Sequence, residues 1–327
     1  MQAARRKHWR RSESEGIDMK ASLAMDTALG DALRALIAGD AESESKPQPA
    51  GIDAVTPIGG GSISRTLLIE SGQRRCFVKL HDPGLLDMFV AEADGLRALA
   101  ACPALRVPRV VGHGRAGGHA YLVLEHLRLH GLREAQEVAA AGRSLAELHR
   151  ITGQQYGWHR DNFIGSTPQL NTGRTSWPAF FATQRLQAQL ALAAAGGHHG
   201  RLIAEGEQLA ENLATLFADQ RPTASLLHGD LWSGNAAIDE TGRLTLFDPA
   251  VHFGDRECDL AMSELFGGFP ESFYAAYREA WPVPSGYAQR RTLYQLYHVL
   301  NHLNLFGSGY LRQAQAMIAS LLAEIGH

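Results

Sequence analysis

The chain has 327 residues, of which 45% are apolar and 20% are charged, and its formal net charge is −3, from 31 basic and 34 acidic residues. This composition excludes a disordered chain and predicts one or two compact domains with a sizeable core. The balanced charge provides no basic field that would attract nucleic acid or an anionic membrane, so a small neutral substrate suits it better.

Hydropathy and cysteine usage indicate the compartment. No apolar run reaches the roughly 18 residues that span a bilayer, and the N-terminus lacks the apolar core of a secretory signal. We therefore expect a cytoplasmic protein. Cys76, Cys102 and Cys258 are scattered and form no CxxC pair, which predicts reduced thiols rather than disulfides or a thiolate metal site.

The N-terminal segment, residues 1–25, combines basic residues with a Ser-Glu-Ser-Glu stretch and has no apolar period, which predicts a disordered basic tail. A helix is expected over Thr27–Ile37, because its leucines fall on one helical face. Residues 41–50, with two prolines among Glu, Ser and Lys, are predicted to form a loop.

Residues 26–125 are predicted to form an N-terminal nucleotide-binding lobe, a small antiparallel sheet with one helix packed on it. The helical period over Leu86–Ala100 places Glu92 in the middle of that helix. β-Branched and apolar residues indicate short strands at Val55–Ile58, Thr66–Ile69, Cys76–Leu80, Val107–Val111 and Tyr121–Leu124.

Residues 126–327 are predicted to form a larger, mostly helical C-terminal lobe. Helical periods indicate Glu134–Arg150, Trp177–Ala195, Leu202–Phe217 and further helices from Leu260 to the end. They are interrupted by a strand at Ala224–Leu227 and by a hairpin that pairs Ala236–Ile238 with Leu244–Phe247. A strand-rich lobe followed by a helical lobe is an α+β, two-lobed fold with a cleft between the lobes.

Lysine is rare in this chain. Only four of the 31 basic residues are lysines, and three of them, Lys7, Lys20 and Lys46, lie in polar N-terminal segments. Lys79 is therefore the only lysine in the expected folded body. Because lysine and arginine are not interchangeable at a phosphate, Lys79 indicates a site that needs a compact ammonium group, with chance as the alternative.

A glycine-rich turn, Gly59-Gly60-Gly61-Ser62, lies between the first two predicted strands. Its backbone could approach a triphosphate closely and offer N–H groups to it, although glycine turns are also common in ordinary hairpins. Lys79 would neutralise the α and β phosphates, and Glu92 in the following helix would hold its flexible stem.

The most informative stretch runs from His228-Gly229-Asp230 to Asn235, followed by the predicted hairpin and Asp248. The hairpin returns Asp248 to the side of Asn235, where a carboxylate and an amide oxygen suit Mg²⁺. Asp230 lies on a glycine-flanked loop and can accept a proton from an attacking hydroxyl. The order of glycine turn, lysine, glutamate, HGDxxxxN and aspartate indicates ATP-dependent phosphoryl transfer.

These motifs resemble a known group. His228-Gly229-Asp230-x4-Asn235 with Asp248-Pro249 is similar to the aminoglycoside-phosphotransferase-like branch of the protein-kinase-like superfamily. Residues 158–169, 227–235 and 256–269 narrow the resemblance to the fructosamine kinase (ketosamine-3-kinase) family, from about Asp26 to the C-terminus. The resemblance implies ATP-dependent phosphorylation of the 3-hydroxyl of a ketosamine, whose product releases its amine and so repairs glycation.

Carried over by position, the resemblance makes Asp230 the catalytic base and Asn235 and Asp248 the Mg²⁺ ligands. It makes Lys79 with Glu92 the ion pair that binds the phosphates of ATP.

The resemblance also implies two supporting parts. Glu125 to Leu127 would form the hinge whose backbone contacts adenine, and Asp259 would brace the catalytic loop by hydrogen bonding. Two positions depart from the family pattern, since Ser62 stands where some members carry cysteine and Asp255 stands where histidine is expected.

Three other features have simpler interpretations. His149, which closes a helix, is interpreted as a partner of the helix dipole. Trp232 either stacks on a sugar or packs the loop that carries it. Trp158–Asn162 is too polar for a generic linker, and the residues alone give it no role.

Two alternative functions stay open. One is a kinase of the same fold acting on another alcohol, such as an aminoglycoside or choline, although no dense acidic cluster lies between Gly173 and Gly200 to meet a polycation. The other is a nucleotide-binding pseudokinase. For the favoured function we expect a small or protein-bound ketosamine as partner, no nucleic acid or membrane, and a monomer or homodimer.

Overall fold

The structure is a computed structural model that describes residues 27–40, 51–59 and 64–326. The chain divides into two compact units. The first contains the described residues up to Ala93 together with Pro108–Leu127, and the second contains Asp94–Val107 and the residues from Arg128 onward.

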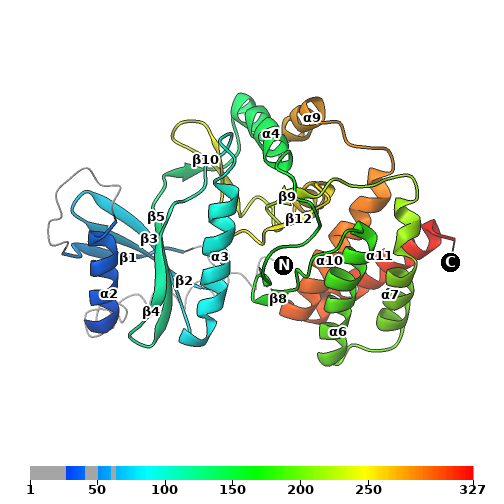
Figure 1. Ribbon diagram of the computed structural model, residues 1–327, viewed down its shortest axis with the longest axis horizontal. Coiled ribbons are helices and arrows are strands. Elements are labelled where there is room, and N and C mark those ends of the chain that lie inside the picture. The colour runs from blue at the N-terminus through cyan, green and yellow to red at the C-terminus, as the bar shows by residue number, and fades with distance from the viewer. Residues whose placement is uncertain (1–26, 41–50, 60–63, 327) are drawn as a thin grey trace. The chain divides into compact units, whose positions relative to one another are not determined.

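The first unit is built on a five-stranded antiparallel sheet with the strand order β1-β2-β3-β5-β4 (Figure 1). The apolar face of α2, with Leu29, Leu33 and Ile37, packs on sheet residues that include Leu67 and Val78. The elements are α2 (Thr27–Ala38), β1 (Ala54–Pro57), β2 (Arg65–Ser71), β3 (Arg74–His81), η1 (Pro83–Leu85), the first part of α3 (Leu86–Leu99), β4 (Val110–Ala116) and β5 (His119–Glu125).

The predicted helices and the first three strands of this unit are confirmed, with shifts of a few residues at their ends. The strand predicted at Val107–Val111 was placed too early, because β4 begins at Val110. Arg106, which lies just before β4, instead exchanges backbone hydrogen bonds with Leu244 and Leu246. This pairing assigns the segment before β4 to the second unit.

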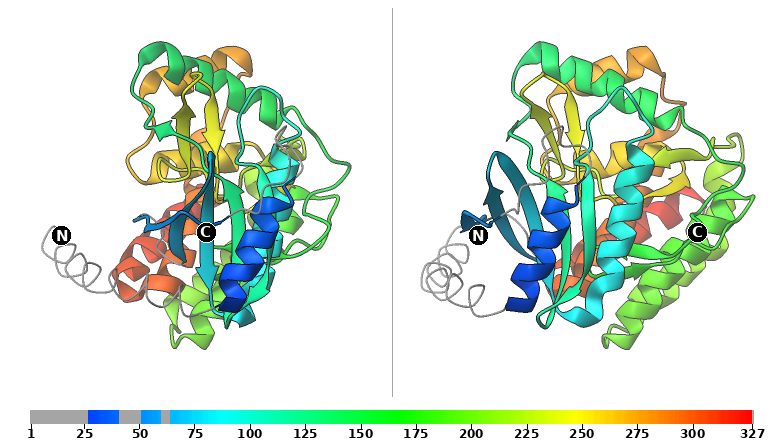
Figure 2. Two further views of the ribbon diagram at one scale, coloured as in Figure 1. Left: turned by 90° about the vertical axis from the view of Figure 1, so that its left-hand side faces the viewer. Right: turned by 60° about the vertical axis from the view of Figure 1, so that its left-hand side comes forward.

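The second unit is mostly helical around one large apolar core. Within it α6, α7, α10 and α11 pack together, and α4 lies beside the β10–β11 hairpin (Figure 2). The elements are β6 (Leu129–His130), α4 (Ala135–His149), β7 (Asn162–Ile164), β8 (Thr167–Gln169), α5 (Trp177–Phe181), η2 (Ala182–Gln187), α6 (Ala188–Ala195), α7 (Arg201–Glu211), η3 (Leu213–Phe217), β9 (Ser225–Leu227), β10 (Ala236–Asp239), β11 (Leu244–Leu246), β12 (His252–Gly254), α8 (Glu257–Leu265), α9 (Glu271–Ala280), α10 (Tyr287–Phe306), η4 (Ser308–Tyr310) and α11 (Leu311–Glu324).

The predicted hairpin is confirmed, with Ala236 paired to Leu246 and Ile238 paired to Leu244. The single helix predicted over Trp177–Ala195 is instead α5, a π-helical stretch η2, and α6. The π-helical stretch carries Arg185, which is 1% exposed, and wide turns of this kind often mark places where a helix serves a special contact.

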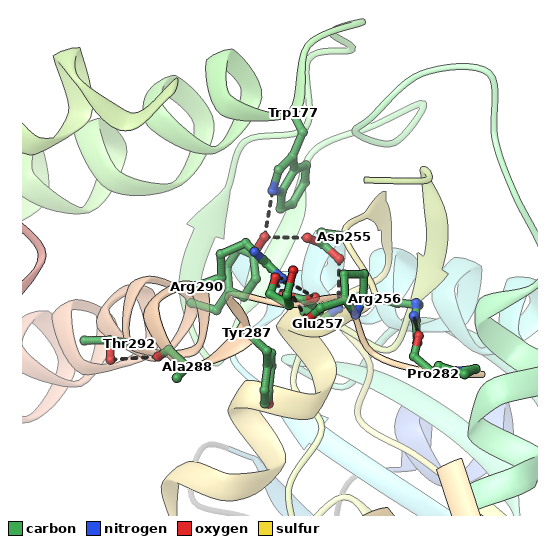
Figure 3. Close-up of polar contacts among 12 residues, drawn as sticks. Trp177, Asp255, Arg256, Glu257, Pro282, Tyr287, Ala288, Arg290 and Thr292 are labelled. Carbon is green, nitrogen blue, oxygen red and sulfur yellow. Dashed lines mark hydrogen bonds and ion pairs between the residues drawn. The ribbon is translucent and has the colours of Figure 1, made fainter. Parts of the chain in front are cut away.

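A network of buried polar side chains lies at the start of α8. The Trp177 indole donates to the Tyr294 hydroxyl (3.0 Å), which donates to the Asp255 carboxylate (2.6 Å). Glu257 receives two hydrogen bonds from the Arg290 guanidinium, at 2.7 and 2.9 Å. Figure 3 shows these groups converging at the start of α8, so the network fixes the helix that carries Asp259.

Two expectations drawn from composition concern thiols and membrane spans. The three cysteines are free, and all three are buried. Among the helices of residues 27–40, 51–59 and 64–326, none is long and apolar enough to cross a bilayer.

Candidate active site

In the first unit Lys79 lies on β3, between Thr66 of β2 and Leu122 of β5. The side chain is 9% exposed, and its Nζ lies 2.6 Å from Oε1 of Glu92 in α3. The predicted ion pair is therefore present. An ammonium group held this firmly on a strand has a fixed position from which it can meet an anionic ligand.

The glycine-rich turn is only partly described. Gly59 has open space where a side chain would stand. Gly60, Gly61 and Ser62 lie outside the described residues, as do Lys7, Lys20 and Lys46.

The predicted hinge follows β5. Oε1 of Glu125 accepts a hydrogen bond from the backbone N–H of Arg109 (2.7 Å), so this side chain is engaged within the first unit. Leu127 is the last residue of that unit. The role of this segment in binding adenine stays a prediction.

In the second unit β9 leads directly into the loop His228-Gly229-Asp230. Asp259 on α8 accepts hydrogen bonds from the backbone N–H groups of His228 (2.7 Å) and Gly229 (2.9 Å). The prediction that Asp259 braces this loop is confirmed. Burial raises the pKa of Asp259, but the hydrogen bonds that its carboxylate accepts from His149 and from the Gly229 N–H oppose burial, and the pKa is lowered.

His228 has the role of a buried framework residue in the same loop. Its Nε2 donates to the carbonyl of Phe247 (2.9 Å), and its Nδ1 accepts from the backbone N–H of Asp230 (3.2 Å). Burial lowers the pKa of the ring, which is therefore neutral and serves as donor and acceptor at once. His228 thereby ties the start of the loop to the segment before Asp248.

The interpretation of His149 as a partner of the helix dipole is wrong. The ring is fully buried, with Nε2 3.2 Å from Oδ2 of Asp259 and Nδ1 2.8 Å from the hydroxyl of Tyr277. Burial lowers its pKa, so the ring carries no charge at neutral pH with which to favour the helix dipole. The sequence position at the end of α4 gave no sign of this contact, because Asp259 and Tyr277 lie far along the chain.

Asp230, Asn235 and Asp248 lie together. The amide nitrogen of Asn235 donates to the backbone oxygen (3.0 Å) and to Oδ2 (3.2 Å) of Asp230. The backbone N–H of Phe247 donates to the carbonyl of Asn235 (3.1 Å), so the hairpin does return Asp248 to the side of Asn235. Burial, followed by repulsion from Asp248, raises the pKa of Asp230 to about 7.

Asp248 has an unusual backbone conformation. Its φ is 56°, and it is the one non-glycine residue with positive φ in the part of the chain that the structure describes. This region costs an L-residue roughly 1 kcal/mol or more, although aspartate tolerates it better than most. Surrounding contacts must therefore hold the residue in place, as is common at functional sites.

The donor set fits Mg²⁺. Carboxylate and amide oxygens are the ligands that this ion prefers, and Asn235 commits its amide nitrogen to Asp230, which leaves the amide oxygen as the donor for a cation. A divalent cation would also offset the repulsion between Asp230 and Asp248 that contributes to the raised pKa.

Trp232 packs on the loop that carries it, which is one of its two interpretations, and stacking on a sugar stays a prediction. The ring is 37% exposed, and a side chain at Gly234 would come within 2.4 Å of it. The indole therefore packs over Gly234 and still presents part of its surface to solvent.

No role is predicted from the residues of the segment that begins at Trp158, but in the structure this segment makes several buried hydrogen bonds. The indole of Trp158 donates to Asp94 (2.7 Å), and the buried Asn162 and Gln169 donate to the backbone just after Asp248. Only the density of amide side chains in this stretch could have indicated that it holds another segment.

Comparison with known proteins identifies the group to which the chain belongs. A profile of the family described as fructosamine kinase matches residues 38–324. A "Probable ketoamine kinase" of Synechocystis sp. is 46% identical over 283 residues, which cover 86% of this chain and 94% of that protein. The "Protein-ribulosamine 3-kinase, chloroplastic" of Arabidopsis thaliana is 40% identical over 274 residues, 83% of each chain.

Solved structures agree with the sequence comparisons. The crystal structure of a "Putative fructosamine-3-kinase" from Haemophilus somnus has a TM-score of 0.78 and 31% identity, and the match covers 89% of this chain and 96% of that one. An aminoglycoside phosphotransferase, at 18% identity and a TM-score of 0.58, shares the fold. These matches confirm the predicted α+β, protein-kinase-like fold class, and the chain belongs to the fructosamine kinase family.

Proposed function

We propose that this protein transfers the γ-phosphoryl group of ATP to the 3-hydroxyl of a ketosamine, with either a small amine or a protein lysine as the amine part. Membership of the fructosamine kinase family supports the substrate class. The observation that carries the chemistry is the grouping of Asp230, Asn235 and Asp248, which lie on the loop that Asp259 braces and on the hairpin that follows it.

Asp230 is the proposed general base. Burial is the largest cause that raises the pKa of this carboxyl above its usual range, and it makes Asp230 a better proton acceptor than an aspartate in water. The hydrogen bond from Asn235 Nδ2 at 3.2 Å orients Oδ2. The sugar 3-oxygen bonds to the γ phosphorus as the bond from that phosphorus to the β–γ bridging oxygen breaks, Asp230 takes the hydroxyl proton, and ADP leaves.

Asn235 and Asp248 are the proposed Mg²⁺ ligands, through the amide oxygen and the carboxylate. Bound Mg²⁺ offsets the negative charge of the phosphates during transfer. The contribution of this chain is to hold the two ligands side by side, since β10 and β11 pair directly behind them.

Lys79 is the proposed partner of the α and β phosphates, with Glu92 fixing its ammonium group. Backbone N–H groups of the turn Gly59–Ser62 are proposed to contact the phosphates, and Glu125–Leu127 to contact adenine.

The test is a substrate panel. The purified protein is given ATP and Mg²⁺ with a fructosyl, a ribulosyl and an erythrulosyl amine, and in parallel with an aminoglycoside and choline, while ADP formation is followed and the product is identified by ³¹P NMR. We expect a sugar 3-phosphate from at least one ketosamine. Turnover of the aminoglycoside or choline alone would refute the proposal.

The matched variant is Asp230→Asn, which keeps the shape of the side chain. We expect turnover to fall at least about 1,000-fold while ADP binding stays within about twofold of wild type, because only the proton acceptor is lost. Wild-type turnover in this variant would show that Asp230 is not the base.

A further inference from the structure

The chain between α4 and α5 contains three buried amide side chains that the proposed chemistry does not use. Asn162, Gln169 and Asn171 are 4%, 2% and 0% exposed. The amide nitrogens of Gln169 (2.8 Å) and Asn171 (2.9 Å) both donate to Oδ1 of Asn162. Buried amides cost free energy unless they are hydrogen-bonded, so this cluster is built for its contacts.

The amide cluster donates hydrogen bonds to the backbone that follows Asp248. Nδ2 of Asn162 donates to the carbonyl of Val251 (2.8 Å), and Nε2 of Gln169 donates to the carbonyl of Ala250 (3.1 Å). Two consecutive carbonyls, two and three residues after the proposed metal ligand, are thus held by one pair of side chains.

The carbonyl of Ala250 also contacts the catalytic loop. Gly229 has a φ of +84°, and a Cβ there would come within 2.0 Å of this oxygen, so only glycine fits. The backbone N–H of Ala250 donates to the carbonyl of His228 (2.8 Å). A displacement of Ala250 would therefore shift both Asp248 and the loop that carries Asp230.

The amide cluster is itself anchored at its other end. The buried guanidinium of Arg185, from the π-helical stretch η2, donates to Oδ1 of Asn171 (2.8 Å) and to the carbonyl of Leu170. The hydroxyl of Tyr297 on α10 donates to Oε1 of Gln169 (2.7 Å). The cluster thus ties the hairpin β7–β8 to two helices and cannot shift without breaking several buried hydrogen bonds.

Asp248 needs such support because of its positive φ. A strained conformation persists when the flanking chain is held on both sides. On one side the carbonyl of Phe247 accepts from His228, and on the other the carbonyls of Ala250 and Val251 accept from the amide cluster.

We propose that Asn162 and Gln169 are positioning residues that hold Asp248 in the geometry required to bind the metal–nucleotide complex, by fixing the carbonyls of Ala250 and Val251. This inference rests on the metal role assigned to Asp248 under the proposed function. It gives the polar segment 158–171 a role in the reaction without contact with substrate.

The test uses Gln169→Glu and Asn162→Asp, which keep side-chain size but replace the amide donor with an oxygen. Affinity for Mn²⁺ in the presence of ADP is measured by electron paramagnetic resonance, which needs no turnover. We expect a loss of about 10-fold or more, the range usual when a group supporting a metal ligand is removed. Hydrogen exchange of the metal-free protein should be faster in the peptide that contains the Ala250 N–H.

Asn212→Asp is the matched control. Asn212 is partly buried at the end of α7, and its Nδ2 donates to the backbone carbonyl of Gln208 (2.9 Å) rather than to residues 249–251 or to the amide cluster. We expect it to lose stability with Mn²⁺ affinity within about twofold of wild type. Thermal unfolding of all variants identifies any that fail to fold. In that case Gln169→Met or Asn162→Leu, which remove the donor without adding charge, replaces the failing variant at the same position.

The outcomes are distinct. Wild-type Mn²⁺ affinity in folded variants at both positions, or an equal loss in Asn212→Asp, would overturn the inference. A wild-type protein that binds Mn²⁺ with ADP but phosphorylates no ketosamine would refute the proposed function, while a selective loss of Mn²⁺ affinity in the variants would still support the positioning role.

Discussion

His149 and Asp259 are 110 positions apart in the sequence, and their side chains meet at 3.2 Å between Nε2 and Oδ2 in the interior of the second unit. The contact belongs to a directed series of hydrogen bonds. Arg256 donates to the hydroxyl of Tyr277 (2.9 Å), and that hydroxyl lies 2.8 Å from Nδ1 of His149. With the neutral ring donating through Nε2, the series ends on the carboxylate that braces Gly229.

We predict that His149→Phe lowers kcat about 10-fold or more and changes the KM for ATP less than twofold. The variant removes one hydrogen bond from Asp259 and loosens the loop that carries Asp230, and small displacements of a reacting group are costly. Steady-state kinetics at varied ATP concentration measures kcat and the KM for ATP separately. Tyr277→Phe leaves the His149–Asp259 contact in place, so its kcat should fall less than that of His149→Phe. An equal fall of kcat in both variants would contradict the prediction that the contact with Asp259 matters most.

Lys79 and Glu92 allow structural and functional roles to be separated. Their side chains are 9% and 15% exposed, so removal of one partner leaves a poorly solvated charge. We predict that Lys79→Met and Glu92→Gln each lower the free energy of unfolding by about 3 kcal/mol. The double variant should regain most of that loss, because neither charge is then left alone.

Among wild type, the two single variants and the double variant, enzyme activity should not follow stability. We expect Lys79→Met and the double variant to be equally poor in ATP turnover, since the ammonium group is missing from both. Chemical denaturation and kinetics on the four proteins provide the two measurements. If the double variant regained activity together with stability, Lys79 would be a structural residue only.

Local patterns account for the parts of the site that the sequence predicted. The hairpin follows from two apolar runs around the turn Glu240-Thr241-Gly242, and it alone brings Asn235 and Asp248 together. Lys79 was singled out by composition, and Glu92 by helical spacing. Each of these inferences needs only residues that are close in the chain or one rare residue type.

The missed parts depend on contacts between distant residues. His149 sits at a helix end, where a charge–dipole role is the simplest local interpretation, and only the burial of its ring against Asp259 overrides it. Strands β7, β8 and β12 have three residues each, too few for a period-two pattern to register. The bonds of Gln169 to the segment after Asp248 span 81 residues and leave no local trace.

The ion pair between Arg290 and Glu257 is predicted to be essential for stability. The two side chains are 5% and 1% exposed, and Arg290 also donates to the carbonyl of Ser285 (2.9 Å). Arg290→Met should lower the free energy of unfolding by about 3 to 5 kcal/mol, because Glu257 is left buried without its cation. Urea denaturation measures the change.

The exposed pair Arg201–Glu205 is the control, with side chains 63% and 27% exposed. Arg201→Met should cost less than about 0.5 kcal/mol, since solvent screens such pairs. Similar losses at the two sites would show that the buried pair contributes no more than a surface pair.

His298 on α10 is predicted to make the protein sensitive to acid. The ring is 5% exposed, and burial, with the neighbouring His302 as the next cause, lowers its pKa from 6.5 to about 3, although Asp259 opposes the shift and Arg185 adds to it. Between these two pH values the unfolded chain binds a proton that the folded chain does not. The free energy of unfolding therefore rises with pH across this window, and the protein loses stability as the pH falls.

Replacing the ring with one that does not titrate should remove this slope. We predict that the stability of His298→Phe relative to wild type improves by about 1.6 kcal/mol when the pH is lowered from 6.5 to 5, because the slope rises from about half of 1.4 kcal/mol per pH unit at pH 6.5 to nearly that full value at pH 5. Denaturation at the two pH values measures the difference. Leu300→Ala, buried on the same helix and unable to bind a proton, should lose the same stability at both pH values. Parallel pH profiles for His298→Phe and wild type would mean that His298 takes up its proton equally in the folded and unfolded chains.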